Sequence, residues 1–181
     1  MGKDNEMKER EDVINLNIGA EAYQKGDYET AIKYYEKSAN AGNVIALSNL
    51  GYCYYYGRSI PVDKKKAKEC WEKAAILGDI AAVYKLGDMY RNGEIEKNLE
   101  YSRALYVRAF EMALESDDIG VCPDAFLRML KYYPEEIEQY YYTQKEIAKS
   151  CVSMLEERIA KGDNYSGKVL KEANAILQKL G

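Results

Sequence analysis

The sequence predicts an all-α protein, a superhelix (solenoid) of stacked antiparallel helix pairs with about nine helices. The first observation is a repeat, in which YEKSANAGN at 35–43 aligns with WEKAAILGD at 71–79, 36 residues later. The second is a block that recurs at the same interval, because Ala46, Leu50, Gly51, Tyr54 and Gly57 align with Ala82, Leu86, Gly87, Tyr90 and Gly93. Two blocks that share one period indicate a repeat protein, whose units must stack to bury their apolar faces.

The composition agrees with a helical globular chain. Of 181 residues, 47% are hydrophobic and 31% are charged, which is typical of a folded protein and not of a disordered one. Only 3 prolines occur, and no run of Val and Ile alternates with polar residues, so helices are favoured over strands. The length suits one domain, and we expect a single helical-repeat domain over 1–181.

The first helix of the best-defined repeat is expected at residues 44–57. Ala46, Leu50 and Tyr54 lie one turn apart and therefore share one face of this helix. Gly51 lies beside that face, where the missing side chain allows a neighbouring helix to approach closely. Gly57 is placed to end the helix.

The second helix of this repeat is expected at residues 64–77. Asp63 is placed to cap it through its carboxylate, and Gly78 is placed to end it. Its apolar stripe consists of Ala67, Trp71, Ala74 and Ala75. The unit is thus a pair of antiparallel helices, which cannot bury both of its faces without a neighbouring pair.

The same reasoning along the chain predicts helices at 10–25, 28–41, 44–57, 64–77, 80–92, 98–116, 122–133, 135–161 and 165–180. They form repeats over 11–43, 44–79 and 80–116, followed by a degenerate repeat over 120–163 and a closing helix over 164–181. Pro134 is expected to begin the long helix of the degenerate repeat, with Glu135 and Glu136 favourable in its first turn. The closing helix is expected to cover the last repeat with an apolar face that contains Val169, Leu170, Ala173, Ile176, Leu177 and Leu180.

Residues 46–79 resemble a known repeat. The pattern consists of Ala46, Leu50-Gly51, the turn GRSIPVDKKKA at 57–67, WEKAA at 71–75 and Gly78-Asp79. It is similar to the Sel-one-like repeat family, a longer-turned relative of the tetratricopeptide repeat. Ser59 departs from the pattern, because the family usually has a second glycine in this turn. The resemblance implies a right-handed α–α superhelix that acts as a scaffold or adaptor, with a peptide or protein in its concave groove.

The resemblance also predicts which side chains face the groove, because the first helix of each pair lines the concave surface in related repeats. The stripe falls at positions −3, +1 and +4 from the helix glycine, on one helical face. These positions hold Leu16, Ala20 and Tyr23, then Ser48, Tyr52 and Tyr55, then Tyr84, Asp88 and Arg91. Tyr54 and Tyr90 fall on the core stripe instead.

The candidate partner-binding residues are therefore Tyr23, Ser48, Tyr52, Tyr55, Tyr84, Asp88 and Arg91. We expect Tyr52, Tyr55 and Tyr84 to anchor a partner, because a large ring gives contact area at the cost of few rotatable bonds. Asp88 and Arg91 are expected to select it through polar contacts. For the tyrosines among these residues, packing between helices is the alternative interpretation.

Composition disfavours several functional classes. A net charge of −4 argues against nucleic-acid binding, which needs a basic face. The charged start lacks the apolar stretch of a signal peptide, and no apolar run reaches the ~18 residues of a membrane span. Histidine is absent and the cysteines form no CxxC motif, so we expect no bound metal and no cofactor. We expect free thiols in a cytoplasmic protein. The cysteines are Cys53, Cys70, Cys122 and Cys151. Asp117 and Asp118 are expected in a solvated loop.

The leading hypothesis is a non-enzymatic scaffold that binds a protein or peptide and has no catalytic residues. We expect a monomer in preference to an oligomer. Two alternatives remain open. One is an enzyme or small-ligand-binding protein with a site in the degenerate 94–163 region, although the missing histidine removes the usual acid–base group. The other is a structural module that associates with itself through exposed tyrosines.

Overall fold

The computed structural model describes the main chain of residues 2–181 and the side chains of residues 11–181. Regular secondary structure in this part of the chain is helical throughout, which confirms the all-α prediction. The elements are α1 (Gly2–Gln24), α2 (Tyr28–Asn40), α3 (Val44–Tyr56), α4 (Lys64–Ile76), α5 (Ile80–Asn92), α6 (Leu99–Leu114), α7 (Cys122–Tyr132), the 3₁₀ helix η1 (Pro134–Tyr140), α8 (Gln144–Ala160) and α9 (Gly167–Lys179).

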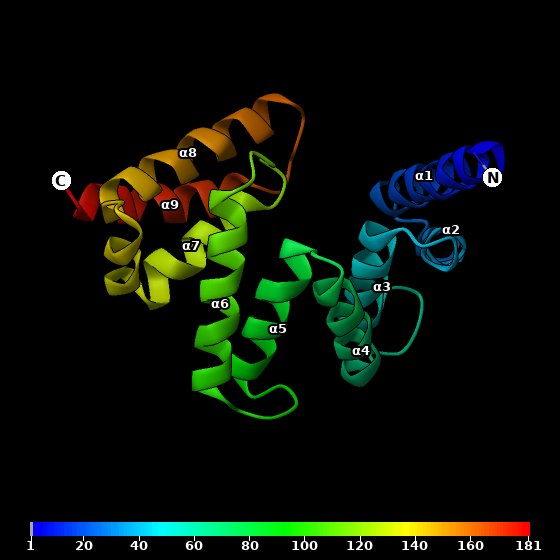
Figure 1. The fold of residues 1–181 in the computed structure, drawn as a ribbon, viewed down its shortest axis with the longest axis horizontal. Helices are drawn as coiled ribbons and strands as arrows, with labels where there is room; N and C mark the ends of the chain where they lie inside the picture. The colour runs from blue at the N-terminus through cyan, green and yellow to red at the C-terminus, as the bar shows by residue number, and fades with distance from the viewer. Residues whose placement is uncertain (1) are drawn as a thin grey trace.

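Successive helices pack as pairs, and the pairs stack one after another along the structure (Figure 1). Helix α1 contacts α2, α3 contacts α4, and α5 contacts α6. The pairs are joined by contacts of α2 with α3, α4 with α5 and α6 with α7, and the two chain ends lie at opposite ends of the structure. This arrangement confirms the stacked superhelix that the repeat period predicts.

Side-chain caps start the helices at repeated positions. Asp63, the predicted cap of α4, accepts a hydrogen bond from the main-chain nitrogen of Lys66 at 2.9 Å. The same contact to the third residue of the following helix recurs at Asp27, Asn43, Asp79 and Asn98. These residues satisfy main-chain donors that have no partner within the first helical turn. The caps therefore fix where each helix from α2 to α6 begins.

A glycine faces an aromatic ring inside each of these pairs. A Cβ atom placed on Gly51 would lie 2.3 Å from Nε1 of Trp71, and one placed on Gly87 would lie 2.6 Å from Cε1 of Tyr106. Gly19 has the same relation to Tyr35. The prediction that Gly51 and Gly87 mark a close approach of two helices is confirmed. The ring of one helix occupies the space that a side chain of the other leaves free.

The turn between α3 and α4 contains a strained residue. Gly57 ends α3 with φ +66°, as predicted. Ser59 follows with φ +54°, in the left-handed region that side chains with a Cβ rarely adopt. This is the position at which the related repeats usually have glycine. At this position the sequence therefore has serine where both the repeat pattern and the left-handed backbone favour glycine.

Replacing Ser59 by glycine is expected to stabilise the protein. Ser59→Gly should raise the free energy of unfolding by about 0.5–1 kcal/mol, because glycine adopts the left-handed region without a steric cost from Cβ. Urea unfolding followed by circular dichroism measures the change. The matched control is Ser153→Gly, an exposed position within α8, where glycine should lower stability by about 0.5–1 kcal/mol. A shift of the same sign in both variants would contradict the expectation.

The predicted helix over 135–161 is wrong, because the chain forms two elements there. The residues from Pro134 form η1, and α8 begins only at Gln144. Tyr141 lies between them with φ +64°, a conformation that a right-handed helix does not contain. Thr143 then starts α8 with a capping box, in which Thr143 and Glu146 each accept a hydrogen bond from the main-chain nitrogen of the other.

Helix α1 also differs from the prediction, since it begins at Gly2 and not near residue 10. Its first turns are rich in Lys, Glu, Met and Arg, which have high helix propensity. The apolar periodicity used for the prediction is absent there, so the signal for a buried face appears only farther along the helix.

Buried apolar side chains form two clusters. The smaller cluster joins α1, α2 and α3 and consists of Ala22, Ala31, Tyr35, Ala46, Leu50 and Cys53. The larger cluster extends from α4 to α9 and includes Trp71, Tyr106 and Phe110, each no more than 1% exposed. Half-buried Tyr54 packs against both clusters.

Candidate functional site

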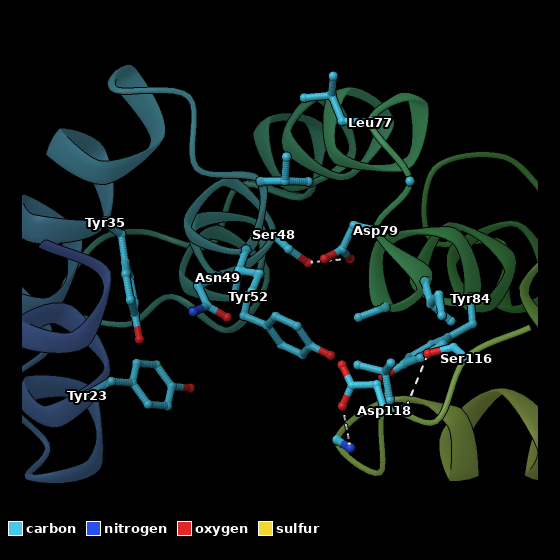
Figure 2. A pocket seen from close by; sticks show the side chains of 17 residues that line it. Tyr23, Tyr35, Ser48, Asn49, Tyr52, Leu77, Asp79, Tyr84, Ser116 and Asp118 are labelled. Atoms are coloured by element: carbon cyan, nitrogen blue, oxygen red, sulfur yellow. Dashed lines mark hydrogen bonds between the residues drawn. The ribbon is translucent and has the colours of Figure 1, made fainter. Parts of the chain in front are cut away.

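A cleft of about 720 Å³ crosses the first three helix pairs. We call it the tyrosine cleft, and Figure 2 shows its lining. Its walls come from α1, α2, α3 and α5, from the turn before α5, and from the segment between α6 and α7. The lining residues are Tyr23, Tyr35, Val44, Ile45, Ser48, Asn49, Tyr52, Leu77, Gly78, Asp79, Ile80, Ala81, Tyr84, Ser116, Asp118, Gly120 and Val121.

The wall between α3 and α5 is held by a polar contact. Ser48 Oγ donates a hydrogen bond to Oδ1 of Asp79 at 3.0 Å, and the main-chain nitrogen of Ala82 donates to the same oxygen at 2.6 Å. Burial raises the pKa of the Asp79 carboxyl, and the nearby negative charge of Asp118 adds to the rise, against the two hydrogen bonds. Asp79 therefore caps α5, joins it to α3 and presents a carboxylate to the cleft.

The aromatic wall is built on Trp71. The ring of Tyr52 stands edge-on to Trp71, with ring centres 5.5 Å apart, and the ammonium of Lys85 lies 5.1 Å from the Tyr52 ring centre. Burial raises the pKa of the Tyr52 hydroxyl. At the other end of the cleft, Arg58 Nε donates to the hydroxyl of Tyr23 at 3.3 Å. Exposed apolar side chains form the rim, with Ile45 55% and Leu77 60% exposed.

A second polar group, the Arg128 cluster, lies beside the cleft between α5 and α7. Arg128 makes two hydrogen bonds to the carboxylate of Asp88, Nε to Oδ1 at 2.8 Å and Nη2 to Oδ2 at 2.6 Å. The hydroxyl of Tyr106 donates to Oδ1 of Asp88 at 2.8 Å. The guanidinium also covers the ring of Tyr84, with Cζ 4.1 Å from the ring centre. Burial lowers the pKa of Lys85 in this cluster, and the positive charge of Arg128 contributes.

Four of the predicted binding residues line the tyrosine cleft, namely Tyr23, Ser48, Tyr52 and Tyr84. Tyr84 is only 4% exposed, because Arg128 covers one face of its ring. Ser48 is 2% exposed, and its hydroxyl donates a hydrogen bond to Asp79. Tyr52 and Tyr23 are half-buried and present part of their surface to the cleft. The role of these residues in binding a partner stays a prediction.

The other three predicted residues, Tyr55, Asp88 and Arg91, do not line the cleft and have partners within the chain. The Tyr55 hydroxyl donates to Oε1 of Glu94 at 2.6 Å, and its ring centre lies 5.4 Å from that of Trp71. Asp88 belongs to the Arg128 cluster. The guanidinium of Arg91 lies 3.7 Å from the ring centre of Tyr132 on α7. These residues connect neighbouring elements of the superhelix.

The structure adds lining residues that the sequence pattern missed. Asn49 lies two positions before Gly51, so the stripe that faces the cleft is wider than the three positions predicted. Asp79 could have been found, because it aligns with Asn43 in the repeat and both cap a first helix. Asp118 lies in a segment outside the clear repeats. The repeat period therefore does not predict that this segment lies against α3 and α5.

The fold and its repeating contacts agree with a family match. The Sel1 repeat model matches residues 16–43, 44–79 and 80–114, which together make up more than half of the chain. The chain belongs to the Sel1 repeat family. The three matched Sel1 repeats correspond to the helix pairs α1–α2, α3–α4 and α5–α6. This confirms the resemblance inferred from the turn and from the alanine, glycine and tryptophan positions.

Curated relatives of this Sel1 repeat chain are longer proteins. It is 29% identical over 99 residues to the ERAD-associated E3 ubiquitin-protein ligase component HRD3B of Arabidopsis thaliana, covering 55% of this chain and 16% of HRD3B. It is 40% identical over 50 residues to DAP3-binding cell death enhancer 1 of Rattus norvegicus, covering 28% of this chain and 10% of that protein. The chain thus spans less than a fifth of the length of these relatives.

A solved structure shares the Sel1 repeat architecture. The crystal structure of a Sel1 repeat protein from Oxalobacter formigenes superposes with a TM-score of 0.62 at 20% identity. The superposition covers 94% of this chain and 74% of the other. Because it extends beyond the three matched Sel1 repeats, α7, α8 and α9 also belong to a known helical arrangement.

Metal ligands, thiols and apolar helices could each form another kind of site in the described part of the chain. No group of three or more His, Cys, Asp or Glu residues gathers there as a metal-binding set. The four cysteines are unpaired, and burial raises the pKa of each thiol. None of the described helices is long and apolar enough to span a membrane.

Proposed function

We propose that this chain is a non-catalytic protein-interaction module, which holds a segment of a partner protein in the tyrosine cleft. The observation that carries the proposal is the cleft itself, a preformed hollow across three successive Sel1 repeats. Its volume of about 720 Å³ is within the ~300–1,000 Å³ of common binding pockets. Two relatives support the proposal, because one is named as a ligase component and the other as a DAP3-binding protein. A cytoplasmic location and a monomeric state are parts of the proposal.

The lining suits a peptide segment. Ile45 and Leu77 offer apolar surface at the rim, and Tyr52 and Tyr23 offer rings with a polar end. The half-buried amide of Asn49 has no hydrogen bond to another described side chain or main-chain group, so it is free to pair with a peptide main chain. Tyr52 is fixed by Trp71, which lowers the entropy lost when a partner binds.

Removing the Tyr52 ring is expected to weaken peptide binding. Peptides selected from a displayed random library against the full chain serve as probes, and calorimetry measures the affinity of the strongest synthetic peptide. Tyr52→Ala should weaken it by ~1–2 kcal/mol or more, about 5- to 30-fold, as aromatic anchors do. Ile45→Ala should weaken binding less, and this exposed position on the rim tests the cleft with little risk to folding.

The matched control is Tyr165→Ala. Tyr165 is 80% exposed and lies outside the cleft, between α8 and α9. Its loss should leave the affinity unchanged, and melting curves check that all variants are folded. Selected peptides whose affinity ignores both Tyr52 and Ile45 would overturn the proposal. That outcome would favour the competing hypothesis of a ligand site in the 94–163 region.

A further inference from the structure

The tyrosine cleft contains negative charge and no positive charge among its lining residues. Its ionisable groups other than tyrosine are the carboxylates of Asp79 and Asp118. Arg58, Lys85 and Arg128 lie over rings of lining tyrosines, and Arg158 Nη1 donates to the carbonyl oxygen of Gly120 at 2.7 Å, but none of these cations belongs to the lining. Arg158 is paired with the carboxylates of Asp124 and Asp163. Arg128 is already bound to Asp88 through two hydrogen bonds. An occupant of the cleft thus meets acidic groups to which no cation among residues 11–181 is hydrogen-bonded.

In the part of the chain whose side chains are described, each of the two carboxylates accepts hydrogen bonds through one of its oxygens. Asp79 accepts hydrogen bonds from Ser48 and Ala82, both through Oδ1. Asp118 accepts one from the main-chain nitrogen of Gly120 at 2.8 Å, also through Oδ1. Among the described residues, no donor contacts Oδ2 of either side chain. A carboxylate can accept several hydrogen bonds, so two acceptor oxygens remain for a ligand.

The two like charges disfavour each other across the cleft. Asp118 raises the pKa of Asp79, in addition to the larger effect of burial. A cation placed between them would relieve this repulsion and would supply donors to both Oδ2 atoms. In Figure 2, Asp118 and the hydroxyl end of Tyr52 point toward the same space. The face of a tyrosine ring is itself attractive to an ammonium or a guanidinium group.

We propose that the partner segment carries an arginine or lysine, whose cationic head lies between Asp79 and Asp118 with its stem along Tyr52. This inference rests on the proposed function and adds the chemistry of the partner. The recognition is by charge and by hydrogen bonds to Oδ2, while the apolar rim contacts the neighbouring residues of the segment. It predicts that basic residues are enriched among peptides that the cleft selects.

The test uses a charged peptide and a neutral copy of it. The probes are the capped tripeptides acetyl-Ala-Arg-Ala-amide and acetyl-Ala-citrulline-Ala-amide, which differ in charge but hardly in shape. Each peptide is titrated into the full chain to about 20 mM, and the NMR chemical shifts of the main-chain amides are followed. This range detects the millimolar binding expected of so small a ligand. The arginine peptide should shift the amides of Ala82 and Gly120 and bind at least ~5-fold more tightly than the citrulline peptide.

A matched pair of variants locates the charge. Asp118→Asn keeps Oδ1 for the bond from Gly120 and should weaken the arginine peptide about 5- to 10-fold. Asp117→Asn removes the same charge from the neighbouring exposed residue, which does not line the cleft, and should change the affinity less than twofold. Equal effects of the two variants would mean general attraction to an acidic surface, and would overturn the inference. Equal binding of the two peptides, or no shift with the arginine peptide, would also overturn it.

These outcomes separate this inference from the proposed function. One outcome is that the selected library peptides lack basic residues although their affinity depends on Tyr52. That result would refute recognition of a basic side chain, but it would be consistent with the proposed interaction module. Library peptides whose affinity ignores Tyr52 and Ile45 would refute the module itself.

Discussion

Gly51→Leu is expected to unfold the second helix pair, with a loss of about 3 kcal/mol or more in the free energy of unfolding. The reason is the contact with Trp71, which is fully buried. A Cβ on Gly51 would lie 2.3 Å from the indole Nε1, and the indole is held there by its hydrogen bond to the carbonyl oxygen of Ser48 at 3.1 Å. Since the space around the indole is filled, a leucine must separate α3 from α4. Urea unfolding followed by circular dichroism measures the loss.

The matched control for this variant is Gly167→Leu. Gly167 is the first residue of α9, is exposed, and has no atom near the place of a Cβ. Leucine there should change the free energy of unfolding by less than about 0.5 kcal/mol. An unchanged urea midpoint for Gly51→Leu would show that α3 and α4 do not meet at this glycine, and that the register of the repeat is different.

Asp88→Ala is expected to cost about 2–4 kcal/mol, because it removes a largely buried carboxylate that accepts two hydrogen bonds from Arg128 and lies 3.9 Å from the ammonium of Lys85. Arg128 and Asp88 are 15% and 23% exposed in their side chains. Without the carboxylate, Arg128 loses two hydrogen bonds and Tyr106 loses the acceptor of its hydroxyl. The pair joins α5 to α7, so the loss should be seen as a lower melting temperature and a looser C-terminal half.

The control for Asp88 removes the same charge from the surface. Asp117→Ala lies in an exposed loop and should change stability by less than about 0.5 kcal/mol. The double variant Asp88→Ala with Arg128→Met should recover part of the loss, because the guanidinium that loses the Asp88 carboxylate is then removed as well. A double variant that is as unstable as the sum of the single variants would mean that the two side chains stabilise the fold independently.

The fold was predictable where the sequence repeats. Gly51 and Gly87 follow the 36-residue period, and their aromatic partners Trp71 and Tyr106 follow it to within one residue, so a local pattern also determines long-range packing. The prediction was wrong after Pro134, where no repeat guides the assignment. There, the left-handed Tyr141 and the capping box of Thr143 break a stretch that looks helical in composition. Such interruptions depend on one or two residues and not on periodicity.

The candidate site was predictable only in part, for a geometric reason. The helical stripe selects residues by direction, and two of the residues that it selects, Tyr52 and Ser48, line one cleft. It does not separate Tyr54 from Tyr55 as a core and a groove residue, because both are half-buried. The large ring of Trp71 extends under Tyr55 and gives it packing contacts. Of the two carboxylates in the cleft, Asp118 lies in the segment between α6 and α7, outside the clear repeats, so its position depends on the tertiary fold alone.

The division of the apolar core into two clusters has a consequence for how the molecule opens. The smaller cluster holds α1 and α2 through only a few side chains, while the larger one holds α4 to α9. In a solenoid each unit contacts only its neighbours, so the first pair can unfold locally while the rest stays native. Amide hydrogens of α1 and α2 then exchange with solvent more readily than those of α5 and α6.

The cleft crosses the boundary between these clusters. Tyr23 and Tyr35 belong to the side of the smaller cluster, and Tyr84 belongs to the larger one. A segment bound in the cleft therefore requires the first helix pair to be folded. Its binding would raise the free energy needed to open this pair locally. Under the proposed function, binding of a partner and folding of the N-terminal helices would therefore be one coupled equilibrium.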